Sequence, residues 1–162
     1  MNDIFTINYE IIKSQKLNIT DKDTQRPWGG FFVISENNSQ DFSKIYFNGL
    51  NTEELKVSGK LSPKILIIYP NKRLSWQYHH RRSEIWKVVN GQIKVVTSHD
   101  DVERKEKILK EGDEIRLYKG ERHRIIGLDD YAVVAEIWIH TDKDNPSDEN
   151  DIVRVQDDFD RN

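Results

Sequence analysis

Two neighbouring histidines, His79 and His80, stand between a glutamine and a glutamate in the stretch NKRLSWQYHHRRSEIW, residues 71–86. Side chains on a β-strand alternate between its two faces, so Gln77 and His79 share a face and His80 points the other way. Glu84 follows His79 by five residues, across a bend. If the two strands pair as a hairpin, we expect these three side chains on the shared face to converge on one point.

His123 comes later in the chain, in a β-like stretch after Gly120. Two imidazoles, a carboxylate and an amide oxygen form a ligand set that suits Zn, Mn, Fe, Co or Ni. A shell of four protein ligands, one of them a neutral amide, leaves room for water or a substrate. Spacing alone leaves a second interpretation open, in which His79 and His123 are satisfied core residues of a purely structural β-barrel.

The bulk composition describes about one domain of 162 residues with no cysteine, which excludes disulfides and thiolate metal sites. The net charge is −3, but residues 142–162 hold eight acids and three bases, so the rest of the chain has a small positive excess. Bases clustered around a concave site would favour an anionic small molecule. We expect no nucleic-acid partner, because the chain is slightly acidic and shows no nucleic-acid motif.

No stretch is long and apolar enough for a signal peptide or a membrane-spanning helix, so we expect a cytoplasmic protein with no membrane partner. From residue 64 onward, short alternating or β-branched runs separated by turn signals predict an antiparallel sandwich or barrel. Asn90–Gly91 predicts a two-residue hairpin within residues 84–98. Residues 5–17 fit a helix or a strand, residues 35–43 look like a loop, and DIVRV at 151–155 fits a strand or short helix.

The spacing of the central stretch resembles the first cupin motif, and that from Gly112 to His123 resembles the second. The departures are Asn71 for Gly, Gln77 for His, Tyr118 for Pro and Gly127 for Asn. Gln77, in place of the first histidine of the motif, narrows the resemblance to one subfamily of cupins. LSWQYHHRRSEIW is similar to the signature of the cupin domain of type II mannose-6-phosphate isomerases, although Arg81 and Ile85 stand where that signature has histidines. RPWG at 26–29, GERHR at 120–124 and DIVRVQDDFDR at 151–161 also resemble that family, as well as small stand-alone cupins labelled phosphomannose or phosphoheptose isomerases.

This resemblance implies an all-β fold, the cupin double-stranded β-helix or jelly roll, with short N- and C-terminal extensions. We expect a single domain over residues 1–162, with the barrel core at about 26–140 and an acidic extension at 141–162. The resemblance also implies a divalent metal, zinc first, held by Gln77, His79, Glu84 and His123. A homodimer is a family-level expectation, and the unmatched stretch 44–64 could form a lid over the barrel.

The reaction that the resemblance implies is aldose–ketose isomerisation of a sugar phosphate, which moves a proton between C1 and C2 and needs a base. Glu136 is the first candidate, because alternation in VVAEIWIH puts it on one face with Val134 and Trp138, and an interior carboxylate would have a raised pKa. A second interpretation is equally open, in which Glu136 faces outward and pairs with a basic side chain. His80 is the second candidate for the catalytic base. Candidate phosphate-binding residues are Arg73, Arg82, Arg122 and Arg124.

Three other functions remain compatible with the same residues. A cupin that binds a sugar or nucleotide sugar would keep the barrel without catalysing a reaction. A metal-dependent dioxygenase would use iron with the same nitrogen and oxygen ligands. A structural or interaction barrel would need no metal at all.

Overall fold

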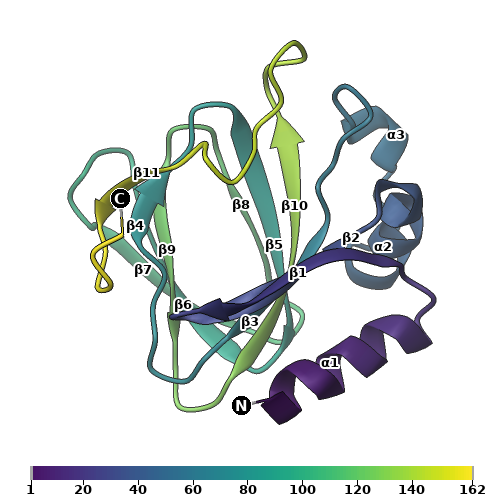
Figure 1. Cartoon of the computed structure of the whole chain (residues 1–162). Coiled ribbons are helices and arrows are strands. Elements are labelled where there is room, and N and C mark those ends of the chain that lie inside the picture. Colours follow the sequence, from purple (N-terminus) through teal and green to yellow (C-terminus); the bar gives the residue numbers. More distant parts are fainter. Residues whose placement is uncertain (1, 162) are drawn as a thin grey trace.

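The computed structural model describes residues 2–161, which form two antiparallel β-sheets packed face to face (Figure 1). The strands of the larger sheet, in sheet order, are β1 (Ile19–Arg26), β2 (Gly29–Ile34), β3 (Lys64–Ile68), β10 (Ala132–His140), β5 (Arg82–Asn90) and β8 (Glu114–Leu117). Those of the smaller sheet are β11 (Val153–Gln156), β4 (Trp76–Tyr78), β9 (Arg122–Gly127), β6 (Gln92–Ser98) and β7 (Lys105–Lys110). The all-β jelly roll predicted from the cupin motifs is confirmed.

The turn at Asn90–Gly91 connects the two sheets. Gly91 adopts a φ of 78°, and a Cβ there would lie 2.8 Å from the carbonyl oxygen of Tyr131, so the position requires glycine. Before the turn, β5 pairs with β10 and β8; after it, β6 pairs with β7 and β9. The predicted hairpin is therefore wrong in its pairing, although both strands exist. The hairpin expected between the strand of His79 and the strand of Glu84 does not form either, because β4 and β5 lie in different sheets.

Alternation along the strands divides the apolar residues into two cores. In β3, Leu66 and Ile68 pack between the sheets, whereas Ile65 and Ile67 face outward and pack under helices. Every residue of β3 is therefore buried, which accounts for its continuous apolar sequence. The interior core also contains Trp86, which is 1% exposed and forms part of the wall of the cavity described below.

Helices cover the outer face of the larger sheet (Figure 1). They are α1 (Asn2–Ser14), the short 3-10 helix η1 (Glu36–Asn38), α2 (Ser39–Tyr46) and α3 (Thr52–Leu55). The helical alternative for residues 5–17 therefore holds over most of that range. The loop predicted at 35–43 is wrong, because Phe42 and Tyr46 lie one helical turn apart and bury together against this face.

Residues 44–63 do not cover the barrel opening. Phe47 and Leu61 are buried in the outer core beside Ile65 and Ile67, so this stretch packs on the outside of the larger sheet. The lid predicted for residues 44–64 is therefore wrong, since a lid would have to lie over the space between the sheets. None of the helices within residues 2–161 is long and apolar enough to cross a membrane.

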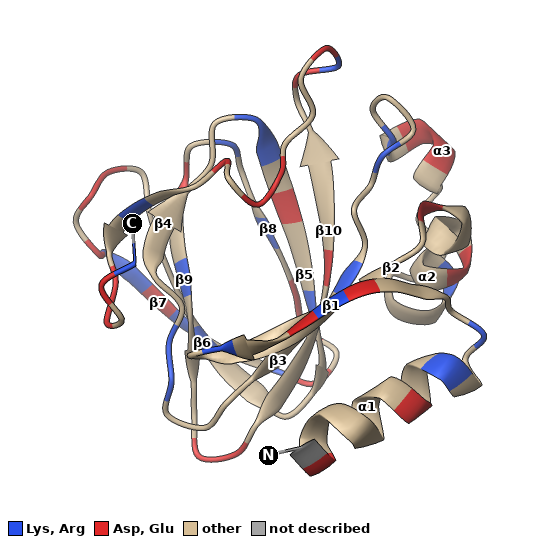
Figure 2. Ribbon diagram, in the orientation of Figure 1, with Lys and Arg blue, Asp and Glu red and all other residues tan. Residues whose placement is uncertain are grey.

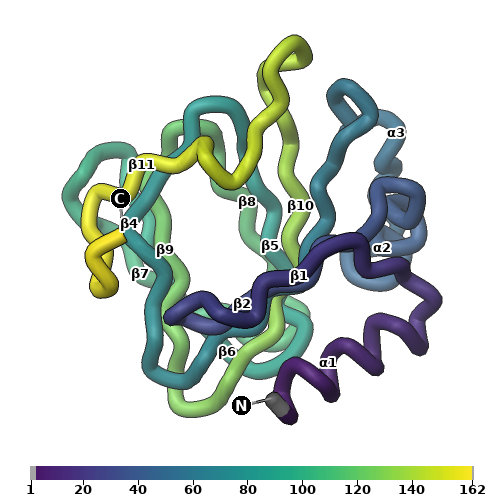
Figure 3. The backbone as a smooth tube through the Cα atoms, viewed as in Figure 1, coloured from purple at the N-terminus to yellow at the C-terminus, as the bar shows by residue number. Residues whose placement is uncertain are grey.

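The C-terminal segment returns to the smaller sheet and adds the strand β11 to its edge. β11 pairs antiparallel with β4, with Arg154 opposite Gln77. Figure 3 shows this yellow segment running beside β4, on the side of the molecule away from the helices. The strand alternative for DIVRV is therefore the observed one, although β11 begins at Val153.

Candidate metal centre and adjoining cavity

Three ligand groups from both sheets meet inside the sandwich. His79 directly follows β4, His123 lies on β9 in the same sheet, and Glu84 projects from β5 in the facing sheet. One ligand atom from each lies within 4.8 Å of the other two, and all three side chains are buried. Gln77 pairs directly with His123 across β4 and β9. The group thus forms across the sandwich interior, where the hairpin assumed from the sequence would not have placed it.

Hydrogen bonds to the backbone fix the orientation of both imidazoles. Nδ1 of His79 donates to the carbonyl oxygen of Asp151 at 2.7 Å, and Nδ1 of His123 donates to that of Glu121 at 2.9 Å. A carbonyl can only accept, so each ring carries its proton on Nδ1 when neutral and presents the lone pair of Nε2. This arrangement of the second nitrogen is typical of histidines that bind metals.

Both Nε2 atoms point toward Glu84. They lie 3.5 Å (His79) and 3.4 Å (His123) from its carboxylate oxygens. Burial lowers the pKa of His79 to about 3, against the opposing effect of Glu84, so His79 is neutral at physiological pH. Nε2 of His123 is buried and makes no hydrogen bond within residues 2–161.

Glu84 supplies the negative charge of the centre. Burial alone would raise its pKa, but opposing positive charge, first of all that of the Arg82 guanidinium, holds the pKa well below its ordinary value. Arg82 donates from Nε to Glu84 at 2.8 Å, and its Nη2 lies 3.2 Å from Nε2 of His79. Two imidazoles that present Nε2 to an ionised carboxylate, one of these nitrogens without a hydrogen-bond partner among the described residues, fit a divalent cation.

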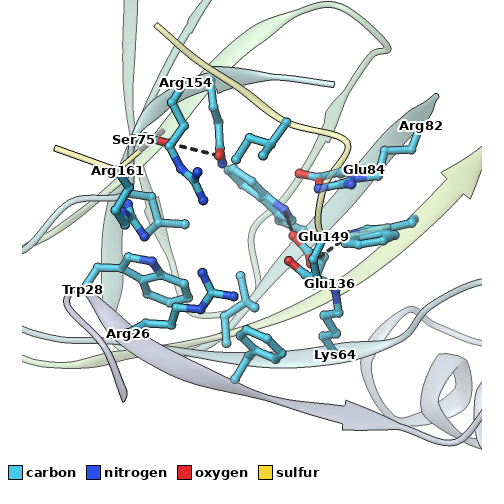
Figure 4. A pocket seen from close by; sticks show the side chains of 17 residues that line it. Arg26, Trp28, Lys64, Ser75, Arg82, Glu84, Glu136, Glu149, Arg154 and Arg161 are labelled. Carbon is cyan, nitrogen blue, oxygen red and sulfur yellow. Dashed lines mark hydrogen bonds and ion pairs between the residues drawn. The ribbon is translucent and has the colours of Figure 1, made fainter. Parts of the chain in front are cut away.

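A cavity adjoins this centre and holds about 610 Å³ of space, part of it open to solvent. Its walls come from both sheets and from the C-terminal segment, and they include Gln77, Glu84 and Glu136 (Figure 4). Figure 2 shows the acidic positions on β5 and β10, which are neighbours in the larger sheet. A ligand in this cavity would contact Gln77 and Glu84, the members of the predicted ligand set that line it.

Glu136 is held by two indoles. Trp86 Nε1 donates to one carboxylate oxygen at 2.8 Å, and Trp138 Nε1 donates to the other at 2.9 Å. Burial and the nearby charge of Glu84 raise the pKa of Glu136 to about 7, against the opposing effect of Lys64 and Arg82. A carboxyl group with that pKa exchanges protons readily at neutral pH, which is what a general base needs.

Comparison with known protein families identifies the chain. Residues 38–157 match the model of the family described as "Mannose-6-phosphate isomerase C-terminal". The chain belongs to this family. The match covers most of the chain and includes every residue of the metal centre. No curated protein sequence matched the chain.

Solved structures share the fold at low sequence identity. CapF, a capsular polysaccharide assembling protein from Staphylococcus aureus, aligns with a TM-score of 0.56 at 16% identity over 86% of this chain and 34% of CapF. CapF with the inhibitor 3-isopropenyl-tropolone aligns at 0.57 and 17%, over 86% and 34% of the two chains. Vicilin from Corylus avellana (hazelnut) aligns at 0.57 and 14%, over 86% and 36%. The present chain therefore spans about a third of the length of these proteins, and the likeness concerns the fold alone.

In this member of the mannose-6-phosphate isomerase C-terminal family, several predicted site residues lie outside the cavity. His80, the second candidate base, is exposed, contacts Tyr78 edge to face and is not among the residues that line the cavity. Arg73 forms a double hydrogen bond with Asp158, which directs it away from the cavity. Arg73, a candidate phosphate-binding residue, therefore does not line the cavity.

Arg122 and Arg124 flank His123 on β9, so alternation turns both to the opposite face. Arg122 packs over the Tyr78 ring and pairs with an aspartate outside the cavity. Arg124 is fully buried and donates to the carbonyl oxygen of Leu74. Of the predicted phosphate-binding arginines, Arg82 lines the cavity, and Arg122 and Arg124 do not.

Four cavity cations were missed from the sequence: Arg26, Lys64, Arg154 and Arg161. Three of them stand in stretches that were recognised as family-like, namely RPWG at 26–29 and DIVRVQDDFDR at 151–161. That resemblance was the available signal, but no local pattern indicated that the end of β1 and the C-terminal segment line the same cavity. Lys64 lies 3.5 Å from the centroid of the Trp138 ring and forms an ion pair with Glu149.

Proposed function

We propose that the protein is a metal-dependent aldose–ketose isomerase that acts on a sugar phosphate, of the mannose-6-phosphate isomerase kind. The observation that carries this proposal is Glu136, a buried carboxyl group with a pKa of about 7 in the cavity that adjoins the His79, Glu84 and His123 group. Isomerisation needs a base of about this pKa close to the carbon atoms that exchange a proton. Membership of the family supports the same reaction class.

The centre formed by His79, Glu84 and His123 would hold the metal, with Gln77 from the neighbouring strand as the fourth ligand and zinc as our first expectation. When bound, a divalent ion would polarise the substrate oxygens and offset negative charge that develops on them. Without two fixed Nδ1–H groups, the imidazoles could rotate away. The carbonyl oxygens of Asp151 and Glu121 therefore contribute to metal affinity through the orientation of the rings.

Glu136 would take the proton from C2 of the aldose and return it to C1, passing through an enediolate. The two indole N–H groups keep its carboxylate oxygens in place and limit its rotation. Trp86 and Trp138 also line the cavity wall beside this carboxylate. Lys64 and Arg82 are both cations close to the Trp138 ring, and their charges favour the ionised form of the base.

The direct test is to incubate the metal-loaded protein with mannose 6-phosphate and measure the formation of fructose 6-phosphate. We expect turnover by the wild type, and a fall in kcat of about 10²-fold or more in Glu136→Gln, the range typical of general bases. Glu111→Gln, at an exposed turn, is the matched control and should leave kcat unchanged. Absence of turnover in a folded, metal-loaded wild-type protein would contradict the proposal.

A second candidate is a sugar-binding cupin without catalysis, and one observation favours it. Arg82 already donates to Glu84 and lies within hydrogen-bonding distance of His79, so two members of the centre have a partner inside the chain. Such a protein would bind a sugar phosphate with saturation but release it unchanged. Ligand binding by calorimetry without isomerisation would select this candidate over the enzyme.

A further inference from the structure

Three arginines from distant parts of the chain line one end of the cavity, around Trp28 (Figure 4). Arg26 ends β1, Arg154 lies in β11, and Arg161 stands near the end of the described residues. The two tail arginines reach the cavity because β11 adds to β4 and sets Arg154 opposite Gln77. The C-terminal segment is thus part of the wall of the candidate site.

Aspartates outside this cluster orient two of the guanidinium groups. Nε of Arg26 donates to Asp23 at 2.9 Å. Arg161 donates from Nε and Nη2 to the two oxygens of Asp157, at 2.8 and 2.9 Å. Neither interaction uses Nη1, so each guanidinium is held by one edge while another part can face a ligand. Guanidinium groups fixed in this way match the geometry of phosphate oxygens.

The positive charges at this end are close enough to oppose one another. Burial lowers the pKa of Arg154, and the charges of Arg161 and Arg26 lower that pKa further, against the opposing effect of Asp157. An anion placed among the three would relieve this repulsion. At the other end of the cavity, the carboxyl groups of Glu84 and Glu136 lie beside the cations Lys64 and Arg82, so opposite charges offset one another there (Figure 4).

We propose that Arg26, Arg154 and Arg161 form a subsite for a phosphomonoester. A ligand then lies with its phosphate against the arginines and an uncharged hydroxyl or carbonyl end against Glu84 and Glu136. The identification of that second end as the reacting carbons rests on the proposed function, whereas anion binding does not.

Calorimetric titration of the full-length protein with inorganic phosphate tests the subsite. We expect saturable binding by the wild type and a loss of affinity of about tenfold or more in Arg154→Gln and Arg161→Gln, as for the removal of a charged hydrogen bond. Arg154→Lys keeps the charge and should retain most of the affinity. Arg73→Gln is the matched control, since its ion pair with Asp158 belongs to the same segment but lies outside the cavity.

Thermal unfolding of each variant separates loss of the fold from loss of binding. The subsite is overturned if the wild type does not bind phosphate, if folded Arg154→Gln binds it as tightly as the wild type, or if Arg73→Gln loses as much affinity. Retention of affinity in the control and its loss in the cavity variants supports the subsite.

Turnover assays distinguish failure of the subsite from failure of the isomerase proposal. If no sugar phosphate is converted but phosphate binding depends on the arginines, the isomerase proposal fails and the subsite stands. If mannose 6-phosphate is converted and Arg154→Gln keeps the wild-type KM, the subsite fails and the isomerase stands. We expect KM to rise about tenfold in this variant, with a smaller change in kcat.

Discussion

Replacing Glu136 with glutamine should change the stability of the protein in opposite directions at low and high pH. The pKa of Glu136 is raised from 4.5 to about 7 in the folded protein. Between these values the folded protein retains a proton that the unfolded chain releases, so the wild type loses stability as pH rises from 4.5 to 7. Glutamine cannot ionise, so the Glu136→Gln variant does not lose stability in this way as pH rises.

The size of the effect follows from the shift. For one group with these pKa values, the loss of stability is below about 1 kcal/mol at pH 5 and about 3 kcal/mol at pH 8, a difference of about 2.5 kcal/mol. Glutamine also has a cost, because its amide oxygen can accept from only one of the Trp86 and Trp138 indoles and its NH₂ group faces the other. That cost is about 1–3 kcal/mol and does not depend on pH.

Urea unfolding in the presence of EDTA, at pH 5 and pH 8, measures the free energy of unfolding of both proteins. We expect Glu136→Gln to be less stable than the wild type at pH 5 and to gain about 2.5 kcal/mol relative to it by pH 8. Glu111→Gln, at an exposed turn, controls for loss of a surface charge. If the difference between Glu136→Gln and the wild type is the same at both pH values, the raised pKa and its role in the proposed mechanism are refuted.

The other predictions concern the metal and the base. His123→Ala should lose more than about half of the metal bound per chain in elemental analysis, whereas exposed His80→Ala should bind as the wild type does; equal metal content in both would remove His123 from the ligand set. Asp151→Ala should weaken metal affinity by about 10- to 100-fold, because its carboxylate accepts from the backbone N–H groups that directly follow the first histidine ligand; unchanged affinity, and an unchanged visible spectrum with Co²⁺, would refute this. Trp138→Phe removes a hydrogen bond to Glu136 and should move the acidic limb of the pH–rate profile to higher pH; a shift to lower pH would contradict the assignment of the base.

The members of the candidate metal group could be chosen from the sequence, but the way in which they meet could not. Motif spacing led to His79, Glu84 and His123 because each position in a jelly roll fixes a side of the sandwich. The assumed hairpin between the strands of His79 and Glu84 was wrong, since local turn signals do not reveal which sheet a strand joins. Asn90–Gly91 illustrates the same limit, because a tight turn serves equally well to leave one sheet for the other.

The arginines that line the cavity were less predictable than the metal group. Alternation along β9 could have excluded Arg122 and Arg124 once His123 was taken as inward, and the sequence contained that information. Arg154 and Arg161 were not accessible to the same reasoning. Their position depends on the addition of β11 to β4, a contact between segments about 75 residues apart in sequence, which no local pattern encodes.

The central claim is that Glu136 moves a proton at a substrate carbon beside the metal centre. Isomerisation of mannose 6-phosphate in D₂O, followed by NMR of the carbon-bound hydrogens at C1 and C2, measures this step directly. We predict deuterium at the exchanging carbon with the wild type, and at least about 10²-fold slower incorporation with Glu136→Gln at equal metal content. Conversion without any deuterium incorporation, or equal incorporation by both proteins, would contradict the account.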